Sequence, residues 1–211
     1  MNPHDSLARR LLARAPGKLA ILAAALAVAV VAAAGLTAAA GSTTPAVTSS
    51  FSFKLVPATG IATCLPKAAG HVKITTGSLN DTMVVSMSGM PANTGFDLFV
   101  IQQPGAPFGV SWYQTDVHAN GTGSGTATVK GVFDKETFSV SPGGTTTFAP
   151  THQYHLGLWF NNPNVPFNLG CEPGATSPII TPFNGNQHAG IQVLNTAQFP
   201  VDAGPLSHVH R

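Results

Sequence analysis

Charged side chains are scarce in this sequence, because Asp, Glu, Lys and Arg together make up only 9% of its 211 residues. Ordinary soluble domains carry roughly 25%. Four of the ten basic residues stand within the first 18 positions, so from residue 41 onward six basic residues accompany seven acidic ones. This balance excludes the basic footprint of a nucleic-acid-binding protein. The surface must therefore be hydrated by the uncharged polar residues Ser, Thr, Asn and Gln, as is common in proteins outside the cell.

Cysteine is nearly absent, since Cys64 and Cys171 are the only two. Two cysteines in an exported chain most often pair, and we expect a disulfide here. It would close a loop of about 107 residues and stabilise the fold by roughly 4 kcal/mol. The alternatives are two free buried thiols or, less favoured, a metal site built on two distant thiolates.

Catalytic signatures are also missing. The sequence has no Gly-x-Ser-x-Gly elbow, no glycine-rich phosphate loop and no cysteine placed beside a partner as a nucleophile. The seven acids after residue 40 are scattered, so no carboxylate pair stands out. We expect a non-enzymatic protein without a cofactor. A Ser-His-Asp set built from distant strands stays open, because such sets are recognised by geometry.

The N-terminus has the order of charges and apolar residues that marks an export signal. Arg9, Arg10, Arg14 and Lys18 precede an uncharged apolar run from Leu19 to Leu36, and three alanines follow at 38–40. This order predicts residues 1–40 as a helical signal peptide cleaved near Ala40. The run is also just long enough to span a membrane, so an uncleaved N-terminal anchor is the main alternative. Both place the protein outside the cytoplasm, secreted or anchored.

The rest of the chain reads as strands separated by turns. Residues 41–50 are rich in Ser and Thr and predict a flexible linker, 51–205 a single domain, and 206–211 a short C-terminal tail. No segment after the leader has a convincing 3.6-residue apolar period. We expect strands near Phe51–Leu55, His71–Thr75, Met83–Ser88, Phe96–Gln102, Ser111–Val117, Gly125–Phe133, Thr137–Val140, Tyr154–Phe160 and Ile191–Leu194.

The pattern within these segments indicates how they pack. Residues 83–88 alternate, which is typical of a strand with one buried face, whereas 96–101 is apolar except at Asp97. The second pattern predicts a central strand covered on both sides. Asn120-Gly121 is a strong hairpin signal. Many short strands with this punctuation predict an all-β fold, a single antiparallel β-sandwich.

Two stretches carry a resemblance. Ser88–Leu98 and Thr115–Gly123 are similar in their strand-turn-strand spacing to bacterial Ig-like sandwich modules. The segments Phe96–Gln102, Pro107–Tyr113 and Tyr154–Asn161 resemble uncharacterised exported proteins of high-GC bacteria. The resemblance covers most of residues 70–200. It implies an immunoglobulin-like fold and a cell-surface location, and it transfers no catalytic residue.

Histidines suggest a metal site. Asp116 and His118 stand two apart on an expected strand and so point the same way, and His155 on another strand could complete a zinc or copper site. No established metal motif is present, so hydrogen-bonded or surface histidines are the plainer interpretation. A calcium loop beginning at Asp116 is disfavoured, because Ala127 stands where a bidentate Glu is required.

Aromatic residues offer a binding surface. Trp112 or Trp159 could line a sugar-stacking platform. Neighbouring side chains on a strand point to opposite faces, so we expect one member of each of the pairs 112–113 and 159–160 to pack in the core. The sequence thus predicts an exported binding or structural module whose partner is an extracellular ligand or a cell-envelope component. It would contact membrane only through its N-terminal segment. A metal-binding protein and a carbohydrate-binding module are the alternatives.

Overall fold

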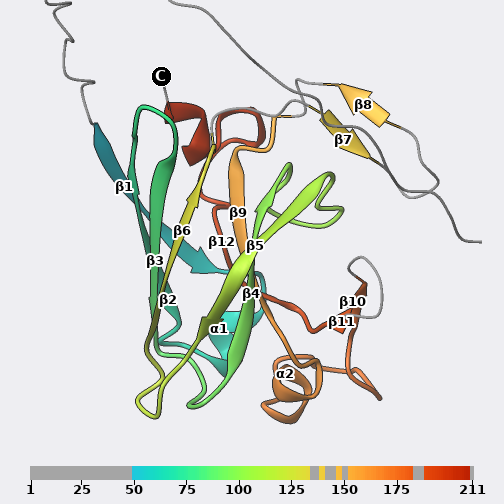
Figure 1. The fold of residues 1–211 in the computed structure, drawn as a ribbon. Coiled ribbons are helices and arrows are strands. Elements are labelled where there is room, and N and C mark those ends of the chain that lie inside the picture. Colours follow the sequence, from blue (N-terminus) through green and yellow to red (C-terminus); the bar gives the residue numbers. More distant parts are fainter. Residues whose placement is uncertain (1–48, 134–137, 141–145, 149–151, 183–187, 210–211) are drawn as a thin grey trace, which may run out of the picture. The chain divides into compact units, whose positions relative to one another are not determined.

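Eight antiparallel strands form one hydrogen-bonded sheet that closes on itself almost completely (Figure 1). The computed structural model describes residues 49–209, apart from 134–137, 141–145, 149–151 and 183–187. Along the sheet the strands are β5 (Ser111–His118), β4 (Gly95–Ile101), β9 (His155–Phe160), β12 (Gln192–Asn195), β1 (Ser50–Pro57), β2 (Ala69–Thr75), β3 (Asp81–Ser88) and β6 (Gly125–Gly131). The predicted all-β antiparallel class is therefore confirmed.

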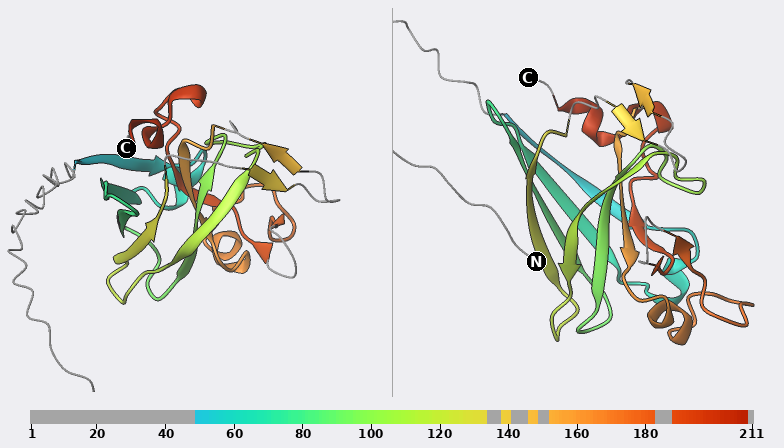
Figure 2. Two further views of the ribbon diagram at one scale, coloured as in Figure 1. Left: turned by 45° about the horizontal axis from the view of Figure 1, so that its top comes forward. Right: turned by 45° about the vertical axis from the view of Figure 1, so that its right-hand side comes forward.

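The chain order explains why the sheet curls. β5 and β6 stand at opposite ends of the strand order, yet they follow one another in sequence and are joined by the turn at Ala119–Ser124. A turn forms at the predicted Asn120-Gly121 and brings the two ends of the sheet near each other, but β5 and β6 do not pair as the strands of a hairpin. After β6 the chain crosses over to β9, which lies beside β4, as in a Greek key. Figure 2 shows the half of the sheet made of β1, β2, β3 and β6 facing the half made of β4, β5, β9 and β12.

The predicted division into two packed sheets is not what the hydrogen bonds describe. β12 pairs with both β9 and β1, so the strands of the two halves belong to one sheet. The β1–β12 ladder is short, with Val56 opposite Asn195 and Pro57 opposite Leu194. The sequence pattern could not distinguish a sandwich from a nearly closed sheet, because inward and outward positions alternate in both.

The core lies inside the sheet and follows from the alternation of side chains. Val72, Ile74, Met83 and Val85 point inward from β2 and β3 and are completely buried. β4, β9 and β12 are buried on both faces, since their outer sides are covered as well. A second apolar cluster fills part of that outer side; it consists of Phe99, Ile101, Trp159 and Ala189, with Phe108 packed against them. The prediction of a doubly covered strand at 96–101 is confirmed.

Short elements complete the domain. They are α1 (Ile61–Cys64), β7 (Phe138–Val140), β8 (Thr146–Phe148), α2 (Asn164–Asn168), β10 (Thr181–Pro182), β11 (His188–Ala189) and the 3₁₀ turns η1 (Val201–Ala203) and η2 (Pro205–His208). The predicted disulfide is confirmed, because Cys64 at the end of α1 is bonded to Cys171 shortly after α2. The disulfide therefore links α1, which precedes β2, to the segment between α2 and β10.

The ends of the domain differ from the prediction at the C-terminus. Leu206 and Val209 are buried in the core, with 0% and 4% of their surfaces exposed, so the domain extends beyond the predicted end at residue 205. The predicted signal peptide or anchor at 1–40 and most of the linker at 41–50 lie outside the described residues. Among the residues that are described, no helix has the length and apolar character needed to cross a membrane.

Candidate functional site

A polar cluster occupies the outer face of β4 and β5. Asp97 lies directly opposite Asp116, and Gly95 lies opposite His118, so both acids and the imidazole share one face. Asn161 joins them from the end of β9, where its backbone N–H donates to the Gly95 carbonyl at 3.0 Å. We call Asp97, Tyr113, Asp116, His118 and Asn161 the β4–β5 polar cluster.

A β-bulge brings the tyrosine into this cluster. Residues three apart on a regular strand face opposite sides, yet Tyr113 donates its hydroxyl hydrogen to Asp116 Oδ1 at 2.8 Å. The ladder shifts between Leu98 and Phe99, and Gln114 is the extra residue on β5. The bulge therefore returns Tyr113 to the face of Asp116, as bulges commonly re-aim side chains.

The two carboxyl groups stay beside each other because neighbouring groups hold them. Asn161 Nδ2 donates to Asp97 Oδ1 at 2.9 Å, and only 8% of Asp97 is exposed. Burial raises the pKa of Asp97 above its usual 3.8, and the hydrogen bond and negative charge of Asp116 raise it further, whereas Asn161 and His118 lower it. Asp97 therefore retains its proton to higher pH than a solvated aspartate does.

The surroundings of Tyr113 raise its pKa as well. Burial raises the pKa of Tyr113 to about 12, with the hydrogen bond to Asp116 as the next cause and the charges of Asp116 and Asp97 after it. Tyr113 thus stays a neutral hydrogen-bond donor throughout the physiological range. The cluster offers hydrogen-bond donors and acceptors at fixed positions.

Replacing Asp97 by Asn should stabilise the protein at neutral pH. Because the folded-state pKa of Asp97 is raised, its favourable contribution is complete below the unfolded value near 3.8 and is lost as pH rises through the folded value. An amide removes that loss and can still accept from Asn161. We expect urea unfolding of Asp97→Asn to show a higher midpoint than wild type at pH 7 and a similar one at pH 3.

A matched control is Asp202→Asn on the exposed η1 turn, which should leave the pH dependence of the midpoint unchanged. A lower midpoint for Asp97→Asn at pH 7 would show that the ionised carboxylate stabilises the cluster, contrary to this account.

The structure does not assemble the predicted metal site. Asp116 and His118 belong to the cluster, but His155 lies opposite Ile101, four residues along β4 from Asp97, or about 13 Å at the usual rise per residue. Within the described parts of the chain, no group of three or more His, Cys, Asp or Glu side chains is arranged to hold a metal ion.

His155 has a structural role instead. It is completely buried, and its Nε2 lies 2.9 Å from the Val201 carbonyl while Nδ1 lies 2.8 Å from Thr196 Oγ1. The carbonyl can only accept, so Nε2 carries the proton and Nδ1 accepts from the hydroxyl. Burial is the main influence on the pKa of His155 and lowers it, although its hydrogen bonds act in the opposite direction. The neutral imidazole fastens β9 to the η1 turn.

The tryptophans are placed differently from the prediction. Trp159 is completely buried against Phe99 and Phe108, with ring centroids 5.5 and 4.8 Å away, so it is not a surface platform. Phe160 beside it is also buried, since β9 is covered on both faces. Trp112 and Tyr113, in contrast, are both exposed, at 55% and 48%. The expectation of one core residue in each pair is therefore wrong for 112–113, whereas at 159–160 Phe160 lies in the main core and Trp159 lies in the second apolar cluster on the opposite face.

The exposure of Trp112 follows from its position at the end of the sheet. It lies opposite Val100, a core residue, and so belongs to the inward-facing side of β5. β5 stands at the end of the strand order, and the exposure on this side is confined to the start of the strand, because Val117 farther along is only 1% exposed. The sequence could indicate an aromatic pair here, but nothing in the sequence revealed Tyr113, Asp97 and Asn161 as members of one site.

Comparisons with known proteins add no assignment. No protein-family model matches the sequence, and no curated protein matches it significantly.

Proposed function

We propose that this chain is an exported, non-enzymatic module that binds carbohydrate on β5. The observation that carries the proposal is the exposure of Trp112 and Tyr113 at consecutive positions of a strand at the end of the sheet. The disulfide supports export, because such bonds form and persist in oxidising compartments. The kinship with Ig-like exported modules remains a prediction alongside it.

The chemistry of this strand suits a sugar. Flat aromatic rings offer apolar surface to the C–H faces of a pyranose, and a few fixed polar groups give orientation and specificity. Trp112 supplies the ring on the inward-facing side of β5, and a sugar that lies across the edge of this end strand would also reach Tyr113 and Asp116 on its outer side. The edge of Tyr113 is held against Phe99, with ring centroids 5.6 Å apart, so the strand presents a fixed surface.

The carboxyl pair argues for binding over hydrolysis. Glycosidases place two carboxyl groups roughly 5–5.5 Å or 6.5–9.5 Å apart so that a nucleophile or a water fits between them and the sugar. Asp97 and Asp116 lie directly opposite each other on the ladder, and Asp97 is only 8% exposed and accepts from Asn161. This arrangement leaves Asp97 no route to a substrate. The alternative of a zinc or copper protein lacks its third ligand, because His155 is committed to Thr196 and Val201.

Removing the indole should abolish binding without unfolding the protein. We expect Trp112→Ala to weaken binding to the preferred sugar on a glycan array by at least about tenfold, equivalent to about 1.4 kcal/mol. Ile180→Ala is the matched control, since Ile180 is exposed to a similar 52% on another segment. Silence of the wild-type protein across the array, or equal binding by Trp112→Ala, would refute the proposal.

A further inference from the structure

The outer face of β1, β2, β3 and β6 forms a regular array that the β5 site does not use. The ladders place its residues in three rows of four across these strands. The first row is Lys54, His71, Ser86 and Thr126; the second is Ser52, Lys73, Val84 and Thr128; the third is Ser50, Thr75, Thr82 and Lys130. Every one of these side chains is exposed or half-buried. We call this array the cationic face.

The only charged side chains on the cationic face are basic, in a chain that has few charges overall. Seven of the twelve positions carry a Ser or Thr hydroxyl, three carry lysine and one carries histidine. Asp81 is the only acid on these four strands, and it is completely buried, with its carboxylate accepting from the backbone N–H groups of Gly77 and Phe133. No carboxylate among these strands therefore neutralises the lysines from the outside.

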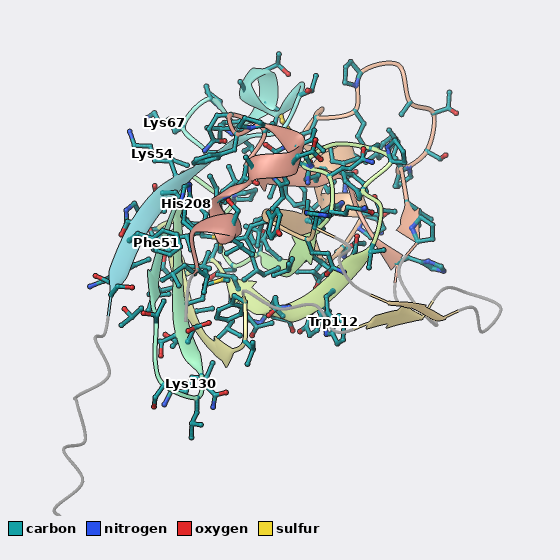
Figure 3. The ribbon with its side chains drawn as sticks, turned by 90° about the horizontal axis from the view of Figure 1, so that it is seen from above. Phe51, Lys54, Lys67, Trp112, Lys130 and His208 are labelled. Atoms are coloured by element: carbon teal, nitrogen blue, oxygen red, sulfur yellow. A yellow bond between two sulfur atoms is a disulfide. The ribbon has the colours of Figure 1, made fainter. Side chains whose placement is uncertain are left out.

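Lys67 extends the same charge beyond the array. It is exposed two residues before β2, and with Lys54, Lys73 and Lys130 it completes the lysines that the structure describes. Figure 3 shows Lys54 and Lys67 near each other and Lys130 farther along the same side of the molecule. Outside these four strands, the described acidic residues are Asp97 and Asp116 of the β4–β5 polar cluster, Glu172 and Asp202. Among the described residues, the lysines and the acids therefore lie on different parts of the domain.

A shallow depression marks one end of the face. It has a volume of about 210 Å³ and is lined by Ala69, Gly70, His71, Ser86, Met87 and Ser88. The Ser86 hydroxyl donates to the His71 carbonyl at 3.2 Å, and Lys54 stands directly opposite His71 on the neighbouring strand. An anionic group placed in this depression would meet the exposed Ser88 hydroxyl, with Lys54 on the neighbouring strand as the adjacent cation.

We propose that the cationic face binds an acidic polysaccharide. Strand spacing and rise per residue give the array a span of about 14 Å in each direction, wide enough for several sugar units lying across the strands. The lysines complement carboxylates that repeat along such a polymer, and the hydroxyl rows can exchange hydrogen bonds with its sugar hydroxyls. Long lysine side chains fit a flexible polymer, because they can follow its charges.

The composition of the face favours this partner over other anionic ones. Membrane-surface binding usually adds buried apolar or aromatic side chains to basic residues, but Val84 is the only apolar residue in the array. Single-stranded nucleic acid is held by aromatic stacking and arginine, and the face has neither. A polyhydroxylated acidic polymer uses both the lysines and the hydroxyl rows.

The test is binding of the full chain to immobilised polygalacturonate, with neutral dextran, phosphatidylglycerol vesicles and single-stranded DNA as separate arms. We expect binding to polygalacturonate alone, weakened by 0.5 M NaCl, because screening acts strongly on exposed charges. The variant Lys54→Gln/Lys73→Gln/Lys130→Gln should bind at least tenfold more weakly. The corresponding triple Lys→Arg variant should keep its binding.

Two controls separate this face from net charge and from the β5 site. Asn168→Asp/Thr176→Glu/Ser177→Glu changes the net charge by the same three units at three exposed positions outside this face and should bind normally. Trp112→Ala should bind polygalacturonate like wild type, so failure of the β5 proposal would be seen separately. The proposal would be overturned if the wild type did not bind polygalacturonate, or if it bound vesicles or DNA equally well. It would also be overturned if the triple Lys→Gln variant and the triple acidic control variant lost binding equally.

Discussion

Reduction of the Cys64–Cys171 disulfide should lower the free energy of unfolding by about 4 kcal/mol. The bond joins residues 107 positions apart, so it removes much of the conformational freedom of the unfolded chain. The closed loop contains β2 through β9, which includes most of the sheet. A loss of this size is a large share of the 5–15 kcal/mol by which ordinary domains are stable.

The measurement is urea unfolding with and without a reductant. The urea midpoint of the wild type should fall when the reductant is added. The midpoint of Cys64→Ser/Cys171→Ser should equal that of reduced wild type and should not change with the reductant. Equal midpoints for oxidised and reduced wild type would mean that the sheet holds the chain without help from the bond.

Replacing Trp159 by Ala should destabilise the protein by about 3–5 kcal/mol. The indole is completely buried and packs between Phe99 and Phe108 in the second apolar cluster, so its loss leaves a large cavity. Gly157 is adapted to it, because a Cβ at that position would overlap the ring of Trp159. Closely packed surroundings of this kind cannot collapse to fill the space.

Trp112→Ala is the matched control, since it removes the same side chain from an exposed position. It should change the free energy of unfolding by no more than about 0.5 kcal/mol. Trp159→Phe should lie between the two. If Trp159→Ala unfolded like Trp112→Ala, the covered outer side of β9 would be refuted.

Local pattern was sufficient for most of the strands. Alternation at 83–88 and the apolar run at 96–101 correctly gave β3 and β4, and Asn120-Gly121 gave the β5–β6 turn. These signals depend on neighbours in sequence. Closure of the sheet depends on β12 pairing with β1 across more than a hundred residues, which no local pattern encodes.

The candidate site was harder to predict because three distant segments build it. Asp116 and His118 were indicated by their spacing, but Asp97 comes from β4, Asn161 from the end of β9, and Tyr113 only through the bulge at Gln114. His155 has the residue type of a ligand, but its hydrogen bonds with Thr196 and Val201 decide its role. Trp112 was identified from its residue type, and its exposure followed from the open end of the sheet.

Because the chain has only two tryptophans, Trp159→Phe leaves the indole of β5 as the single tryptophan, which can be excited selectively over the two tyrosines. The most direct measurement is iodide quenching of this variant with and without the sugar preferred on the array. The account predicts strong quenching in the free protein and protection when the sugar is saturating. Quenching that saturating sugar leaves unchanged would contradict the claim that β5 receives the ligand.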